Sequence, residues 1–183
     1  MIATLVNEVK DGVIATIRGT NEITTEATKL VRDTVVNTLR AGGDITTTAT
    51  EVAASAVSGV ILAASATGTS LVTASKHSVK AVIGGVAEVG GDTTEAASHA
   101  VRTAIKESAQ IGGDVAGVAQ AAVEGAVDAT KEIGGDVAKT TERAVLGAIE
   151  AAEEVSVETA HAVKETLRAT IQGAKEIIEA PLK

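Results

Sequence analysis

The stretch from Gly90 to Val155 repeats one pattern three times in blocks of 22 residues. The blocks read GGDTTEAASHAVRTAIKESAQI, GGDVAGVAQAAVEGAVDATKEI and GGDVAKTTERAVLGAIEAAEEV. Apolar or small residues fall at block positions 1, 4, 5, 8, 11, 12, 15, 16, 19 and 22, and a shift of eleven maps this set onto itself. Eleven residues make three turns at ~3.67 residues per turn, which is close to an undistorted α-helix. Since no two-residue alternation is present, the repeat predicts helices and no strands.

The two halves of each block differ in bulk, because Gly and Ala dominate the apolar stripe of the first half and Val and Ile that of the second. Antiparallel neighbours would place the thin half of one helix against the thick half of the next, which fills a core without voids. We therefore expect an all-α fold, an array of 22-residue helical repeats arranged as an up-down antiparallel bundle or a solenoid. The expected packing residues are the aliphatic side chains at positions 12, 16 and 22 of successive blocks: Val79, Ile83, Val89, Val101, Ile105, Ile111, Val123, Val127, Ile133, Val145, Ile149, Val155, Leu167, Ile171 and Ile177.

The Gly-Gly-Asp triplets have two interpretations. As turns, they combine Gly, which readily ends a helix in the left-handed region, with Asp, which is a strong N-cap. As helix interior, each Gly would cost about 1 kcal/mol relative to Ala. The second Gly should face solvent, where close helix approach gains little, so we favour the turn; long continuous straight or right-handed coiled-coil helices remain the alternative. The punctuation residues are Gly42, Gly43, Asp44, Gly90, Gly91, Asp92, Gly112, Gly113, Asp114, Gly134, Gly135 and Asp136.

The same phase extends over most of the chain. The expected helices cover 2–18, 21–41, 44–67, 70–89, 92–111, 114–133, 136–155 and 156–179, with consecutive segments mostly antiparallel. The last block lacks the Gly pair, which leaves open that it continues its predecessor as one long helix. Residues 1–67 carry degenerate repeats and residues 68–183 regular ones, and we expect one continuous structural unit.

Residues 52–75 contain no charged side chain. A membrane-spanning helix needs about 20 predominantly apolar residues, so the length permits one. Ser, Thr and Gly outnumber Val, Ile and Leu in this segment, which favours a helix buried by its neighbours. Membrane contact remains the alternative.

Composition excludes several function classes. The 183 residues include no Cys, Trp, Tyr or Phe, so disulfides, thiolate metal sites and base-stacking platforms are all impossible. The net charge is −8, of which −7 lies in residues 92–183, and without a basic stripe this speaks against nucleic-acid binding. Because Glu8 precedes any long apolar run, we expect no signal peptide and, by default, a cytoplasmic protein.

No catalytic, cofactor or metal site is expected. His77 and His99 share block position 10, but no carboxylate recurs beside them, and a structural zinc site needs four ligands. Gly85 and Gly90 have the spacing of a phosphate loop, yet Gly91 and Asp92 follow where such a loop has Lys and Ser or Thr. No nucleophile and base have a supporting spacing, so we expect a protein that is not an enzyme and binds no cofactor.

The doubled eleven-residue pattern from Gly68 to Ile177 resembles the amphipathic repeats of exchangeable apolipoproteins and, more loosely, of late-embryogenesis-abundant and lipid-droplet coat proteins. This resemblance implies reversible coating of lipid or granule surfaces. The chain departs from that group in having Gly-Gly-Asp where apolipoprotein repeats commonly have Pro, and in lacking aromatic residues.

Two function hypotheses follow. The first is a structural, self-assembling protein that forms a homo-oligomer or filament, because each block can bury its apolar face only against a neighbour. The alternative is an amphipathic protein that binds a lipid, membrane or granule surface. The expected partners are other copies of the chain or, in the alternative, such a surface.

Overall fold

The computed structural model describes residues 2–17, 25–42 and 45–180, and within them the chain forms nine α-helices and no strand. Their bounds are α1 Ile2–Ile17, α2 Thr25–Gly42, α3 Ile45–Thr67, α4 Leu71–Glu88, α5 Thr93–Ile111, α6 Val115–Glu132, α7 Val137–Val155, α8 Val157–Thr170 and α9 Ala174–Glu179. The all-helical prediction is confirmed. Residues 18, 21–24 and 44 of the expected helices, and the punctuation residues Gly43 and Asp44, lie outside the described residues.

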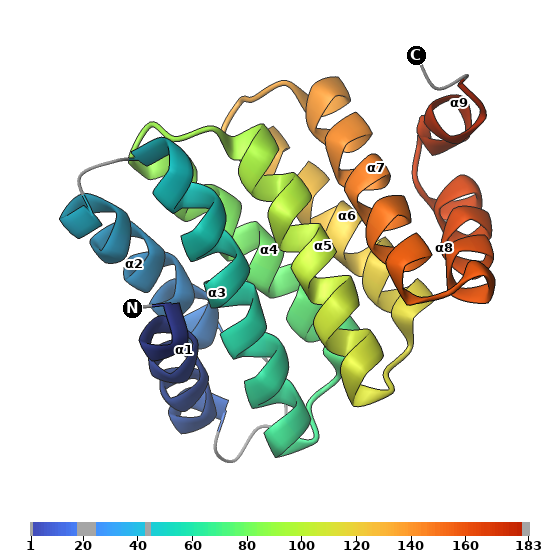
Figure 1. Ribbon diagram of the computed structural model, residues 1–183. Coiled ribbons are helices and arrows are strands. Elements are labelled where there is room, and N and C mark those ends of the chain that lie inside the picture. Colours follow the sequence, from blue (N-terminus) through green and yellow to red (C-terminus); the bar gives the residue numbers. More distant parts are fainter. Residues whose placement is uncertain (1, 18–24, 43–44, 181–183) are drawn as a thin grey trace.

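The helices form two layers, and the chain crosses from one layer to the other at every turn. Each helix packs against the next helix in the chain and against the one after that. One layer holds α1, α3, α5 and α7, and the other holds α2, α4, α6 and α8, with α4 and α6 behind α5 in Figure 1. Because consecutive helices reverse direction, neighbours within a layer run parallel (Figure 1).

Each helix from α4 to α6 ends at a Gly-Gly-Asp turn, so the continuous-helix alternative is wrong. Gly90, Gly112 and Gly134 have φ between 70° and 81°, the left-handed region in which Gly avoids a Cβ clash. At the first turn the amide of Gly90 donates to the Ala87 carbonyl (3.0 Å) and that of Gly91 donates to the Val86 carbonyl (2.9 Å). This pair of bonds is a Schellman motif, and the same pair recurs at the next two turns.

The Asp of each turn caps the following helix, as the sequence predicts. One carboxylate oxygen of Asp92 accepts from the amides of Thr94 and Glu95, at 2.9 and 3.0 Å. Asp114 and Asp136 each accept one amide three residues on, at 3.0 Å. Gly therefore ends one helix and Asp begins the next, which fixes a tight reversal at 22-residue intervals.

Small residues bring parallel helices of one layer into backbone contact. A Cβ placed on Gly125 of α6 would overlap the Lys76 carbonyl of α4, and one on Gly147 of α7 would lie 2.8 Å from Ser98 Oγ of α5. A Cβ on Gly59 of α3 would lie 2.7 Å from the Val6 carbonyl of α1. This spacing suits a core of Ala and Val, in which many close contacts replace the large buried areas of aromatic side chains.

The expected last helix over 156–179 begins where the sequence predicts it, but it is divided into two helices. Ser156 interrupts α7 and α8 with extended backbone (φ −169°, ψ 163°), and its hydroxyl caps α8 by accepting from the Thr159 amide. A second break follows Thr170, where Gly173 has φ 85° and α9 turns onto α7 and α8. The last block is thus neither one helix nor a continuation of α7.

Candidate functional site

The predicted packing residues at block positions 12 and 16 form the centre of the core. All five side chains at position 12 are fully buried, from Val79 to Leu167. At position 16, Ile83 and Ile105 are fully buried and Val127 is half-buried. The remaining two, Ile149 and Ile171, are buried at 8% exposure.

Position 22 differs from positions 12 and 16, because three of its five side chains are exposed and none is fully buried. Ile111, Ile133 and Val155 are 37%, 39% and 41% exposed, whereas Val89 and Ile177 are half-buried against the core. The three exposed residues are each the last residue of a helix or the residue just after it, where the chain leaves the interface with its neighbours. Position 22 belongs to the apolar stripe of the repeat, but at the end of a helix the neighbouring helices leave the side chain partly uncovered.

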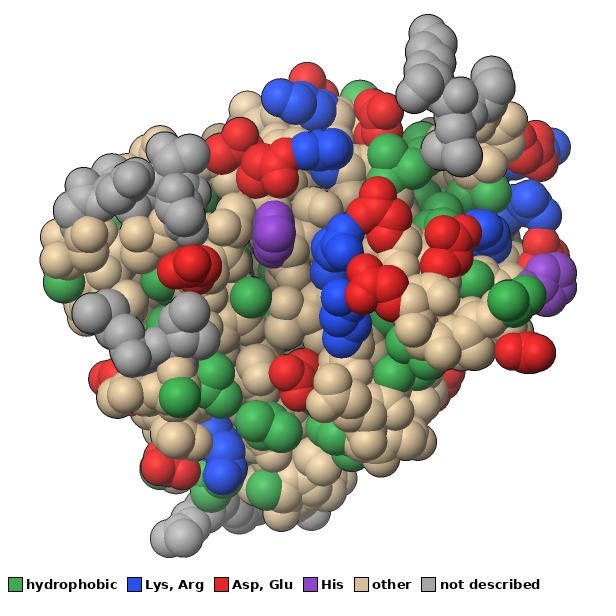
Figure 2. All heavy atoms as spheres, viewed as in Figure 1, with side chains coloured by type: hydrophobic (Ala, Val, Ile, Leu, Met, Phe, Trp, Pro, Cys, Tyr) green, Lys and Arg blue, Asp and Glu red, His purple; other side chains and the backbone are tan. Residues whose placement is uncertain are grey.

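Ion pairs connect parallel neighbours on the outer face of each layer. In one layer Arg102 of α5 pairs with Glu150 and Glu154 of α7, and Lys106 also pairs with Glu154. In the other, the Lys76 ammonium of α4 lies 3.3 Å from Glu124 and 3.4 Å from Asp128 of α6. Figure 2 shows the first set as adjacent basic and acidic side chains over α5 and α7.

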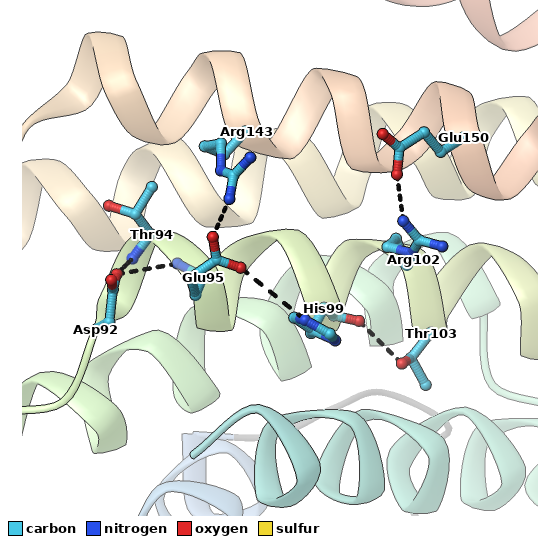
Figure 3. A network of polar contacts seen from close by, with 8 residues as sticks. All are labelled: Asp92, Thr94, Glu95, His99, Arg102, Thr103, Arg143 and Glu150. Atoms are coloured by element: carbon cyan, nitrogen blue, oxygen red, sulfur yellow. Dashed lines mark hydrogen bonds and ion pairs between the residues drawn. The ribbon is translucent and has the colours of Figure 1, made fainter. Parts of the chain in front are cut away.

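Figure 3 shows how this network continues toward the Gly-Gly-Asp turn. Glu95 lies between Arg143 of α7, with which it pairs, and His99, whose Nε2 is 4.0 Å from a Glu95 oxygen. Both partners of the Glu95–His99 contact are partly exposed, and the imidazole lies one turn along the same helix. Exposed pairs of this kind contribute about 0–1 kcal/mol each, so the network sets the register of α5 and α7 more than their stability.

Charge–charge contacts also perturb two ionisable groups. Burial alone would lower the pKa of the Lys76 ammonium, but the hydrogen bond to Glu124 and the charge of Asp128 outweigh it and raise that pKa. A hydrogen bond from Lys106, aided by the charge of Arg102, lowers the pKa of the Glu154 carboxyl. Both shifts keep the paired groups charged at neutral pH.

The two histidines that share a block position lie in different layers. His77 lies on α4 beside Val31 of α2 and Val13 of α1, and His99 lies on the outer face of α5. Across the described residues, no three His, Asp or Glu side chains come close enough to hold a metal ion.

A groove of about 660 Å³ lies between α6, α7 and the turn from α8 to α9. Its aliphatic lining is Val127, Val137, Ala138, Ile171 and Ile177. The charged residues of the groove are Glu124, Asp128, Lys131 and Glu142. The sequence did not indicate this groove, because it depends on the path of the chain after α8.

A second feature is the edge of the molecule at which α5 and α7 end and α8 begins. We call it the α5–α7 edge and define it by Lys106, Ala109, Gln110, Ile111, Glu154, Val155 and Val157. A shallow hollow of about 350 Å³ lies between Gln110 and Val155. Four large hydrophobic side chains are exposed among the described residues, and three of them, Ile111, Val155 and Val157, belong to this edge.

The uncharged stretch lies mainly in α3, whose segment Thr48–Thr67 is long and apolar enough to cross a membrane by length and composition alone. Two thirds of its most apolar window (67%) is buried by other helices. A core helix of a compact fold meets the same length criterion. Its position between α1, α2, α4 and α5 corresponds to the buried-helix interpretation.

The chain matches no protein-family model, no curated protein and no solved structure.

Proposed function

We propose that this protein is a structural protein that assembles with copies of itself, and that it is built as a solenoid of 22-residue helical repeats. Two regularities support the architecture. Left-handed glycines recur at Gly68, Gly90, Gly112 and Gly134. Ion pairs between parallel neighbours join residues 48 apart, which is two blocks plus one helical turn.

The observation that carries self-assembly is the α5–α7 edge. The chain buries the Val and Ile stripe almost completely against itself, so its inner faces are not available to a partner. Of the four large hydrophobic side chains exposed in the described part of the chain, three belong to this edge, and Val157 is 82% exposed. Contiguous exposed apolar side chains rimmed by polar groups are typical of interaction sites.

A second copy fits this edge because the edge carries both signs of charge. Lys106 and Glu154, which pair with each other within one chain, lie beside the aliphatic side chains. Under a two-fold axis, Lys106 of one copy faces Glu154 of the other while the aliphatic groups meet at the centre. An apolar core with a polar rim is the usual anatomy of such an interface, and two-fold pairs are the commonest oligomers.

Sedimentation velocity over a wide concentration range tests the proposal. We expect the mass of the wild-type protein to rise above that of one chain as concentration increases. The double variant Ile111→Lys/Val157→Lys should weaken association at least about tenfold, because it places like charges at the centre of the interface. Ile133→Lys is the matched control on the opposite edge, and it should associate like the wild type.

A wild-type protein that stays monomeric at every concentration would overturn the proposal. So would a double variant that associates as strongly as the wild type, since the α5–α7 edge would then not be the interface.

Binding to a lipid, membrane or granule surface is the second candidate, and the apolar segment Thr48–Thr67 is the observation that favours it. Because that segment is mostly buried, the helices around α3 would have to separate before it could meet hydrocarbon. Flotation with anionic liposomes at low and high salt separates the two candidates. Self-assembly alone leaves the protein in the soluble fraction, whereas the lipid candidate requires it to float.

A further inference from the structure

The groove at the C-terminal end exposes a side chain that the rest of the fold buries. Val127 occupies block position 16, where Ile83 and Ile105 are fully buried, yet Val127 is half-buried and lines the groove. The cause lies in α8, whose residue Ala169 occupies the position of Gly125 and Gly147 but is exposed. Thus α8 packs less closely against α6 than α6 packs against α4, and the core position of Val127 is left partly exposed.

The open space has the size and lining of a small-molecule site. Its volume of about 660 Å³ lies within the range of roughly 300–1,000 Å³ that is usual for ligand pockets. Val127 and Val137 come from α6 and α7, and Ile171 and Ile177 come from the turn after α8 and from α9, so the groove offers a hydrocarbon surface. The turn at Gly173 and helix α9 close one end of it.

The charges around the groove favour a cation. Carboxylates of Glu124, Asp128 and Glu142 line it against the single ammonium of Lys131. Lys131 lies in the last turn of α6, where its charge offsets the negative end of the helix dipole. Lys76 pairs with Glu124 and Asp128, so Glu142 is the carboxylate for which the described residues provide no ion pair.

We propose that this groove binds a small amphiphilic cation, with its hydrocarbon body against Val127, Ile171 and Ile177 and its ammonium group beside Glu142. The aliphatic surface supplies most of the affinity, because burying methylene groups against hydrocarbon is favourable. The carboxylate supplies the preference for a positive head group over a negative one, and the net charge of −8 on the chain acts in the same direction. This site is independent of the α5–α7 edge, since the two share no residue.

Octylammonium and octanoate are matched probes, because they share a hydrocarbon chain and differ in the sign of the head group. Titration of each into the full-length protein, followed by methyl NMR of its Val and Ile residues, reports where each probe binds. We expect octylammonium to cause saturable shifts confined to Val127, Val137, Ile171 and Ile177, and octanoate to bind about tenfold more weakly or worse.

The variant Glu142→Gln should reduce that head-group preference to about twofold or less without altering the fold, because Glu142 is exposed. Glu8→Gln, the same change at an exposed site on α1, is the control and should keep the wild-type preference. Equal binding of the two probes, shifts spread over the whole chain, or no saturable shift would overturn the proposal. Shifts of the same methyl groups on dilution without any probe would also overturn it, since a second copy would then occupy the groove.

Discussion

The junctions between α4 and α7 differ from the two that follow α7. Each of the former combines a left-handed Gly, two carbonyl-capping amides and an Asp that begins the next helix. The junction after α7 has a single extended residue, Ser156, and the junction after α8 has Gly173 and a six-residue helix with no side-chain cap. Hydrophobic positions alone do not distinguish these regions, because Leu167, Ile171 and Ile177 continue the pattern of the earlier blocks.

The difference between these junctions is accompanied by a difference in how closely helices of the same layer pack. Where the Gly-Gly-Asp turn is present, α6 returns against α4 closely enough for Gly125 to meet the Lys76 backbone. Where it is absent, Ala169 of α8 faces solvent and the groove opens beside Val127. From α4 to α8 the apolar stripe therefore determines which face of a helix is buried, whereas the close return of the next helix of a layer coincides with the Gly-Gly-Asp turn.

The largest effect should come from filling the close contact in the regular region. Gly125→Ala places a Cβ against the Lys76 carbonyl, and the resulting shift of α6 should cost about 1–3 kcal/mol of unfolding free energy. Gly84→Ala is the matched control, because its Cβ would meet only the Arg32 side chain at 3.8 Å. Higher helix propensity should then stabilise the control by up to about 1 kcal/mol.

Urea denaturation of both variants measures these free energies. Equal stabilisation by the two substitutions would show that α4 and α6 are not in backbone contact, and the contrast with α8 would disappear.

The sequence predicted the helices of the regular region because several independent signals coincide there. Around Gly90, Gly91 and Asp92 the stripe, the helix-ending Gly and the capping Asp all indicate the same boundary. The solvent-facing second Gly also distinguished a turn from a continuous helix. The close-contact residues Gly125 and Gly147 were missed, although their recurrence 22 residues apart at position 14 was a readable signal.

The C-terminal end could not be predicted to the same extent. Ser156 is compatible with a helix interior, and the Gln172-Gly173 pair is a weaker stop signal than Gly-Gly-Asp. Exposure of Ile111 and Val155 depends on where the neighbouring helices end, which periodicity does not encode. The groove has the same origin, since it depends on the direction of α8 and on the turn at Gly173, which periodicity does not encode either.

A smaller effect should come from the turns themselves. Gly90→Ala forces a Cβ into the left-handed region at φ 74°, which should cost about 1–2 kcal/mol. Ser156→Ala removes only the hydroxyl that accepts from the Thr159 amide at 3.0 Å, so its cost should be about 1 kcal/mol. Thermal unfolding of the two variants under the same conditions compares how much stability each junction contributes. A larger loss from Ser156→Ala would mean that the Gly-Gly-Asp turn is not what holds the regular region in place.

The smallest effect should be a pH dependence that originates in α4 and not in α8. Burial, together with the charges of Lys80 and Lys76, lowers the pKa of His77 from its ordinary 6.5, so the folded protein favours the neutral imidazole. Below about pH 6.5 the unfolded chain then binds more protons at this residue than the folded one. The unfolding free energy therefore decreases as the pH is lowered, until the lowered pKa of the folded state is reached.

Urea denaturation between about pH 5.5 and 7.5, where most carboxylates stay ionised, should detect this fall. His77→Gln should abolish it. His161→Gln, a change at an exposed position of α8, should leave it intact because that side chain is not buried on folding. If His161→Gln abolished the pH dependence instead, the C-terminal end would be the more tightly packed region, and the comparison of the two regions would be reversed.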